Sequence, residues 1–123
     1  MIIGTGIDTV NIHRMEKWVN NPNLLRRYFD PREVEAVGER GKGLVSSIAA
    51  RFAAKEAFGK ALGTGLEKIN LKDIMVLHNS KGKPQLHLTG SALEAMKAAG
   101  AQRVHISITH DGDMALASII LEA

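Results

Sequence analysis

Residues 44–62 constrain the fold more than any other segment, because they are rich in alanine and contain no proline. Alanine has the highest helix propensity of the common amino acids, so this segment predicts a long helix. Gly63-Thr64-Gly65 follows at once, and glycine at this position is typical of the end of a helix. In a chain of 123 residues, we expect such a helix to be the central element of the fold.

Shorter predicted elements lie on both sides of this helix. The N-terminal part predicts a strand at 1–8, a helix capped by Asn11, a short helix after Pro22, and a helix from Asp30 to about Arg40 that Gly41-Lys42-Gly43 ends. The C-terminal part predicts strand pairs at 73–78 with 85–88 and 103–110 with 114–121, separated by a helix at 91–99. This order favours an α+β fold, with an antiparallel sheet packed with helices, because a doubly wound fold would need regular alternation of strands and helices.

The length and composition limit the kind of protein. A chain of 123 residues is expected to form a single domain, residues 1–123, without a linker. The absence of cysteine excludes disulfides, thiolate nucleophiles and cysteine zinc sites. No basic segment precedes the apolar N-terminus, and no apolar run approaches the roughly 18 residues that a membrane span needs. We therefore expect a soluble, cytoplasmic protein that does not bind a membrane.

Positive charge is concentrated in the N-terminal half of the chain. The formal net charge is +3, and residues 11–60 hold ten Lys/Arg against six Asp/Glu, whereas residues 61–123 hold six of each. Such a surplus attracts an anionic partner, which could be nucleic acid, a phosphate-rich cofactor or an acidic protein. Only 4% of the residues are aromatic, which is few for the stacking of bases, so we do not expect nucleic acid.

Phe52, Glu56 and Lys60 are spaced four residues apart, so their side chains share one face of the long helix. Glu56 and Lys60 could simply be a solvated ion pair, and Asp8, expected at a strand-to-helix junction, could simply cap a helix or turn. Two carboxylates on rigid elements can also hold Mg²⁺, with a nearby lysine completing a clamp for a diphosphate. That interpretation requires Asp8 and Glu56 to meet in space. The same helix carries two further cations, Arg51 and Lys55, which could equally well be ordinary charged residues on the protein surface.

Residues 103–110 alternate between apolar and polar side chains, as a strand with one buried face does. Ser107 and Thr109 belong to the polar face, which is commonly the solvent side of a sheet. His110 ends the strand where a loop begins, and a ring in that place can reach a ligand. Gly63-Thr64-Gly65 is foremost a helix end, at the negative end of the helix dipole, so a phosphate near it would have to be held by side chains or loop amides.

Taken together, these segments resemble the holo-acyl-carrier-protein synthase family, the small bacterial 4′-phosphopantetheinyl transferases. The residues that carry the resemblance are Gly4-Thr5-Gly6-Ile7-Asp8 with Arg14, the run from Arg51-Phe52-Ala53-Ala54-Lys55-Glu56-Ala57 to Gly63-Thr64-Gly65, Gly82-Lys83-Pro84, and Ile106-Ser107-Ile108-Thr109-His110. The Phe-x-x-Lys-Glu-Ala block is the most specific of them. The resemblance covers essentially the whole chain and implies the 4′-phosphopantetheinyl transferase fold.

The resemblance implies that this chain transfers the 4′-phosphopantetheine moiety of coenzyme A to a serine of apo-acyl carrier protein, releasing 3′,5′-ADP, for fatty acid biosynthesis. It implies a catalytic group of Asp8, Glu56 and Lys60, in which the two acids are the Mg²⁺ ligands. The residues implied to bind coenzyme A are Lys60, Gly63, Thr64, Gly65, Pro84, Ser107, Thr109 and His110. Those implied to face the carrier protein are Arg14, Arg27 and Phe52. The resemblance also implies a homotrimer whose active sites lie at subunit interfaces.

The implied mechanism is in-line attack by the carrier serine on the β-phosphorus of coenzyme A. Lys60 would offset charge on the diphosphate, and Glu56, or a metal-bound water that it orients, would accept the serine proton. One alternative is a non-enzymatic module that binds an acidic protein or nucleic acid through Arg14, Arg26, Arg27 and Arg32. Another is a magnesium-dependent phosphotransferase that uses a different nucleotide.

Overall fold

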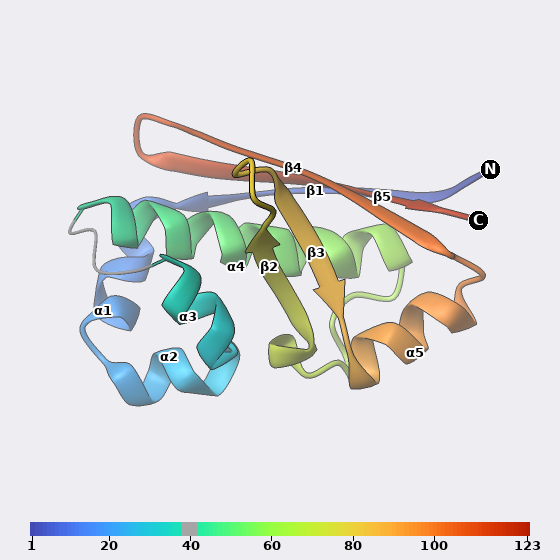
Figure 1. Cartoon of the computed structure of the whole chain (residues 1–123), viewed down its shortest axis with the longest axis horizontal. Coiled ribbons are helices and arrows are strands. Elements are labelled where there is room, and N and C mark those ends of the chain that lie inside the picture. The colour runs from blue at the N-terminus through green and yellow to red at the C-terminus, as the bar shows by residue number, and fades with distance from the viewer. Residues whose placement is uncertain (38–41) are drawn as a thin grey trace.

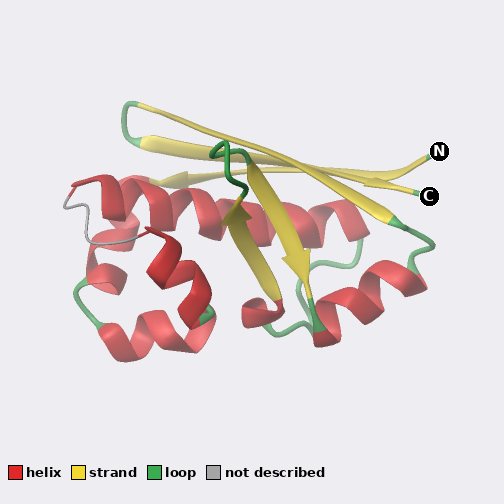
Figure 2. Cartoon of the chain, viewed as in Figure 1, coloured by secondary structure: helices red, strands yellow, loops and turns green. Residues whose placement is uncertain are grey.

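A three-stranded antiparallel sheet lies over one long helix in the computed structural model, which describes residues 1–37 and 42–123 (Figure 1). The strands are, in their order across the sheet, β1 (Ile2–Asn11), β5 (Met114–Glu122) and β4 (Arg103–Asp111). Among the described elements, the helices lie on one face of this sheet, and its outer face is uncovered (Figure 2). The predicted α+β class with antiparallel strands is confirmed.

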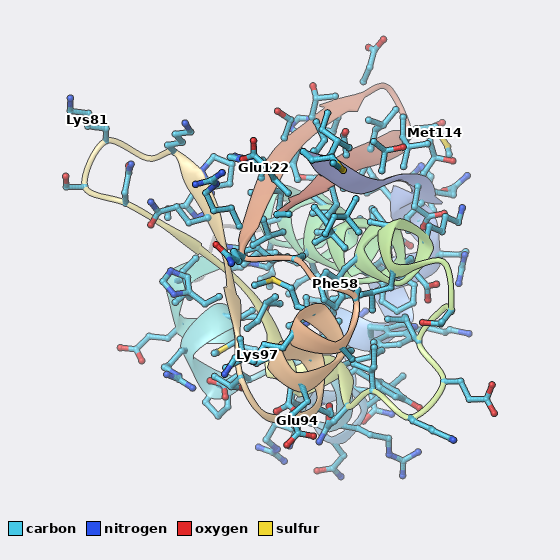
Figure 3. The ribbon with its side chains drawn as sticks, turned by 90° about the vertical axis from the view of Figure 1, so that its right-hand side faces the viewer. Phe58, Lys81, Glu94, Lys97, Met114 and Glu122 are labelled. Atoms are coloured by element: carbon cyan, nitrogen blue, oxygen red, sulfur yellow. The ribbon has the colours of Figure 1, made fainter. Side chains whose placement is uncertain are left out.

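The long helix α4 (Lys42–Leu62) is the centre of the molecule, as its alanine content predicts. Ile48, Ala53 and Phe58 on this helix have no exposed surface, and Figure 3 shows Phe58 beneath the sheet. The helix begins two residues before its predicted start, so Lys42 is helical and not part of a break. Within the part of the chain that the structure describes, no helix is both long and apolar enough to span a bilayer.

Short helices connect β1 to α4. They are η1 (Ile12–Met15), α1 (Glu16–Val19), α2 (Pro22–Tyr28) and α3 (Pro31–Val37). Two of them begin where asparagine side chains accept hydrogen bonds from backbone N–H groups: Asn11 from His13 at 2.9 Å and Asn21 from Leu24 at 3.2 Å. Such caps satisfy N–H groups that have no partner within the helix. The predicted end of α3 near Arg40 lies outside the described residues.

The second half of the fold is a smaller sheet and a helix (Figure 1); the two strands of the smaller sheet cross α4, and one of them contacts β4 of the first sheet. Its elements are η2 (Leu71–Asp73), β2 (Ile74–His78), β3 (Pro84–Leu88) and α5 (Gly90–Ala98). β2 and β3 pair only with each other, so the described strands form two sheets where the sequence predicts one. The predicted strand pairs are themselves confirmed, because each pair is an antiparallel hairpin with a short connection.

Candidate active site

Two glycines allow β1 to lie directly on α4. A Cβ atom added to Gly4 would lie 2.0 Å from the carbonyl oxygen of Ala61, and one added to Gly6 would lie 2.0 Å from that of Ala57. Side chains alternate along a strand, so Asp8 faces the helix as the two glycines do. The close approach therefore brings the Asp8 carboxylate against the last turns of α4. Contrary to prediction, Asp8 lies within β1 and not at a strand-to-helix junction, because the strand continues to Asn11.

Lys60, on α4, forms an ion pair with Asp8 of β1. The Lys60 Nζ atom donates a hydrogen bond of 2.8 Å to Asp8 Oδ1. This bond, followed by the negative charge of Asp8, raises the pKa of Lys60 above its ordinary value. The ammonium group therefore contacts an acid on another element rather than Glu56 on its own helix, and the interpretation of Glu56 and Lys60 as a simple surface pair is wrong.

Glu56 lies one turn before Lys60 and is partly buried beside the same aspartate. Burial raises the pKa of the Glu56 carboxyl, and the negative charge of Asp8 raises it further. The positive charges of Lys60 and Arg14 act in the opposite direction. Two acids and two cations thus interact electrostatically at one place, although they come from β1, η1 and α4. The magnesium interpretation of the sequence required Asp8 and Glu56 to lie close together, and in the fold these two side chains interact.

The two carboxylates, Asp8 and Glu56, have the chemistry to hold a divalent cation. Within residues 1–37 and 42–123, no group of three or more His, Asp or Glu side chains could hold a metal ion. Mg²⁺ does not need such a group, because one or two carboxylates commonly hold it together with water and substrate phosphates. Asp8 and Glu56 repel each other when both are ionised, and a cation between them would remove that repulsion. The donor set of Asp8 and Glu56 is therefore suited to magnesium.

Arg14 stands beside this group of charges, on an aromatic cluster. Its guanidinium carbon lies 5.9 Å from the centroid of the Phe52 ring, a distance at which cation and ring attract. Phe52 is only 8% exposed and packs against Trp18, with ring centroids 5.3 Å apart. Phe52 therefore supports Arg14 from below and presents little surface of its own. Arg27, in the last turn of α2, is exposed.

His13 ties the turn that carries Arg14 to the β4–β5 connection. One ring nitrogen lies 2.9 Å from Glu16 Oε1, and the other lies 3.1 Å from Asp113 Oδ1. The backbone N–H of Ile12 also donates a hydrogen bond of 2.7 Å to the carbonyl of Asp113. The hydrogen bonds to Glu16 and Asp113 raise the pKa of His13. When it is protonated, the ring donates to both acids and so binds η1 to a turn far away in the sequence.

We expect the contribution of His13 to stability to disappear at alkaline pH. Because the folded-state pKa is raised, the contribution is complete below the unfolded value of about 6.5 and is lost as the pH rises through the folded value. The melting temperature of His13→Gln should therefore be lower than that of the wild type at about pH 5.5 and equal to it at about pH 9. His87→Gln, on β3, is the matched control. A deficit of the same size at both pH values would exclude a role for the charged ring.

A second polar cluster lies near the other end of α4, around His110. A cavity of about 280 Å³ is lined by Arg51, His78, Thr109 and His110 together with Ser46 and Ser47. The Arg51 guanidinium donates to Ser47 Oγ at 3.0 Å and lies 3.2 Å from the Nδ1 atom of His78. Pro84 pairs with His78 in the small sheet and borders a neighbouring groove. A guanidinium, imidazole rings and serine hydroxyl groups at one cavity are suited to an anion.

The interpretation of Arg51 and Lys55 as surface charge is wrong, since their exposed fractions are 1% and 0%. Alanines surround both positions along α4, and a helix that is apolar on all sides is expected to be buried on all sides. That pattern is the signal that could have identified them. Burial of Lys55 lowers its pKa, although the charge of Glu33 partly offsets the effect. His78 gave no sequence signal, because only the tertiary fold brings it to Arg51.

The predicted coenzyme-binding residues do not form one site within a single chain. Ala50 lines the cavity at His110, and Lys60 lies ten residues further along α4, about 15 Å at 1.5 Å per residue. Thr64, beyond Lys60, borders a different groove, which lies against α5. Ser107 pairs with Ser118 and lies on the outer face of the sheet. The structure thus gathers Asp8, Glu56 and Lys60 at one place, whereas His110 lines one cavity and Pro84 borders the neighbouring groove.

Comparison with known proteins gives similarity over the whole chain. A model of the 4′-phosphopantetheinyl transferase superfamily matches residues 4–117. A holo-[acyl-carrier-protein] synthase of Treponema denticola is 51% identical over 122 residues, which are 99% of each chain. A crystal structure of the corresponding Neisseria meningitidis protein matches with a TM-score of 0.88 at 32% identity, with full coverage of both chains. The Bacillus anthracis structure, in complex with CoA (3′,5′-ADP), matches with a TM-score of 0.82 at 35% identity, covering 100% of this chain and 98% of that one.

Proposed function

The chain belongs to the 4′-phosphopantetheinyl transferase superfamily, and we propose that it is a holo-acyl-carrier-protein synthase. It transfers the 4′-phosphopantetheine arm of coenzyme A to a serine of apo-acyl carrier protein and releases 3′,5′-ADP. The observation that best supports this function is the convergence of Asp8 and Glu56 from β1 and α4, with Lys60 bound to Asp8. Relatives that are named holo-[acyl-carrier-protein] synthase match along essentially the full chain.

Asp8 and Glu56 are the proposed ligands of Mg²⁺. When bound, the ion would offset negative charge on the diphosphate and orient it for attack. Lys60 is the second source of positive charge, because its flexible, exposed ammonium can move from Asp8 to a phosphate oxygen. The serine oxygen forms a bond to the β-phosphorus, the bond from that phosphorus to the bridging oxygen breaks, and 3′,5′-ADP leaves. Glu56 is the proposed acceptor of the serine proton, directly or through a water that it orients.

The cavity around Arg51, His78 and His110 is the proposed site for the phosphorylated nucleotide. The Arg51 cation matches the negative charge of 3′,5′-ADP, and Thr109 and His110 line the same cavity. By resemblance, Pro84, Ser107 and the turn Gly63-Thr64-Gly65 border the same nucleotide. Because these residues are divided between two ends of α4, we propose that a complete site combines residues from more than one copy of the chain.

A homotrimer with active sites between subunits would meet this need. The outer face of the three-stranded sheet is free of other elements in the described chain and exposes apolar side chains, with Ile7 57% and Met114 39% exposed. Apolar surface of this kind marks an interaction site. Native mass spectrometry should find an assembly of three 13.3-kDa chains. A mass of one chain at micromolar concentration would contradict the trimer.

The remaining proposals concern the carrier protein and the cell. Arg14 and Arg27 are exposed cations on the helices before α4, and an acidic acyl carrier protein is expected to dock there. Phe52, buried below Arg14, would act on docking by holding that guanidinium in place. We further propose that residues 1–123 are one phosphopantetheinyl transferase domain, and that it works in the cytoplasm, in fatty acid biosynthesis.

The intact mass of an apo acyl carrier protein tests the function directly. After incubation with this protein, coenzyme A and Mg²⁺, the carrier should gain the mass of one phosphopantetheine arm. No gain should occur without coenzyme A, or when the carrier serine is replaced by alanine. An unchanged carrier mass in the complete reaction would overturn the proposed function and favour a module that only binds acidic proteins.

A further inference from the structure

A buried ion pair joins the proposed catalytic helix to the helices that precede it. Lys55 of α4 and Glu33 of α3 have no exposed side-chain surface, and Lys55 Nζ donates to Glu33 Oε1 at 2.7 Å. The same ammonium donates to the carbonyl of Leu71 at 2.8 Å and to that of Ile74. Its three N–H groups thus have three acceptors on different elements, so the side chain can adopt only one orientation.

Glu33 extends this network to the beginning of α3 and to β2. Its Oε2 atom accepts a hydrogen bond of 3.0 Å from the backbone N–H of Val76, and its Oε1 atom accepts one of 3.2 Å from that of Asp30. Asp30 lies at the junction of α2 and α3, and the ring of Phe29 beside it packs 4.8 Å from Lys55 Nζ. The pair therefore holds together the junction after α2, helix α3, strand β2 and α4.

Stability alone does not account for such a pair. Replacing a buried ion pair with apolar groups of similar volume is often neutral or stabilising, because taking two charges out of water costs more than their attraction returns. Directional bonds, in contrast, fix the orientation of the elements that they connect. Lys55 immediately precedes Glu56 on α4, so the elements that Lys55 binds are held at a fixed place relative to the helix turn that carries Glu56. Arg27 lies on α2, which ends two residues before Asp30.

We propose that Lys55 and Glu33 are positioning residues that hold the carrier-docking helices in a fixed orientation to Glu56. The pair touches neither substrate; it sets where the serine of a docked carrier arrives relative to the diphosphate. This inference rests on the proposed transfer reaction. It predicts that the pair affects the use of the carrier protein and leaves the binding of coenzyme A unchanged, because α4, which carries Glu56 and Lys60, is itself held by its close packing against β1.

The double variant Lys55→Met/Glu33→Gln separates positioning from folding. It removes both charges and keeps side-chain volume, whereas Lys55→Met alone leaves a buried, unpaired carboxylate and should be strongly destabilised. At a temperature where circular dichroism shows the double variant to be folded, kcat/KM for the carrier should fall about tenfold, an effect expected of a misplaced serine. The KM for coenzyme A should stay within about twofold of the wild type. Lys97→Met, on exposed α5 (Figure 3), is the matched control and should change neither value.

The outcomes are distinct. A folded double variant with wild-type kcat/KM for the carrier would overturn the inference, and so would an equal rise in both KM values. If the double variant does not fold, Glu33→Asp keeps both charges but shortens one side chain, and it should show the same selective loss, in smaller measure; a wild-type value there overturns the inference too. Wild-type protein that fails to modify the carrier at all would instead refute the proposed function. Arg14→Ala serves as the reference for weakened carrier docking.

Discussion

Replacing Glu56 with glutamine is expected to reduce phosphopantetheine transfer by about 10³-fold or more, because one substitution removes both a proposed metal ligand and the proposed proton acceptor. Glutamine keeps the size of the side chain and so leaves the packing of α4 intact. The measurement is the rate at which the mass of the carrier increases under saturating coenzyme A and Mg²⁺. Glu94→Gln, on the exposed surface of α5, is the matched control and should retain the wild-type rate.

Stability distinguishes a catalytic Glu56 from a structural one. Burial and the charge of Asp8 raise the pKa of Glu56, so its ionised form is less favourable in the folded than in the unfolded protein. Above the folded-state pKa, the neutral glutamine should therefore leave the melting temperature unchanged or raise it. A variant that is both inactive and markedly less stable at pH 7 would point to a structural role. Wild-type transfer rates in Glu56→Gln would remove the metal and base assignments together.

Replacing Gly6 with alanine is expected to cost about 3 kcal/mol of folding free energy, at the upper end of the usual cost of overpacking. The new Cβ atom would lie 2.0 Å from the carbonyl oxygen of Ala57 and 2.6 Å from the backbone nitrogen of Ala61. Both atoms belong to the backbone of α4, which cannot move aside as a flexible side chain could. Strand β1 must shift away from the helix, and Asp8 must shift with it.

The loss should appear in both stability and activity. Denaturation by urea at a fixed protein concentration measures the first, and transfer by protein that remains folded at low temperature measures the second. Thr5→Ala, one residue away on the outer face of the sheet, is the matched control and should cost little. If Gly6→Ala were as stable as Thr5→Ala, the close contact of β1 with α4 would not exist as described.

Local sequence patterns predicted most elements, because those elements depend on neighbouring residues. Asn11 and Asn21 cap helices through N–H groups two and three residues ahead, and the turn at Asp111-Gly112-Asp113 joins strands that pair with each other. The boundaries of β1 and α4 were less well predicted. β1 continues past Asp8 because β5 pairs with it as far as Asn11, and a partner strand far away in the sequence leaves no local signal.

In the candidate site, too, local patterns predicted some features and only the tertiary structure revealed others. Spacing alone put Phe52, Glu56 and Lys60 on one face of a helix, and alternation put His110 at the end of a strand. The spacing of residues along the sequence did not predict that Lys60 binds Asp8, or that Lys55 is buried beside Glu33. Each of these pairs joins residues on different elements, and their electrostatics depend on burial, which a single sequence does not report.

By itself, then, the amino-acid sequence determined the α+β class, the long central helix and the resemblance that identified Asp8 and Glu56 as a pair. These follow from helix propensity, side-chain periodicity and motifs within one segment. Only the tertiary structure decided that the two carboxylates meet, because their meeting depends on how closely β1 approaches α4. The absence of side chains at Gly4 and Gly6 permits that close approach. The packing of the sheet against the helix then holds β1 at this short distance from α4.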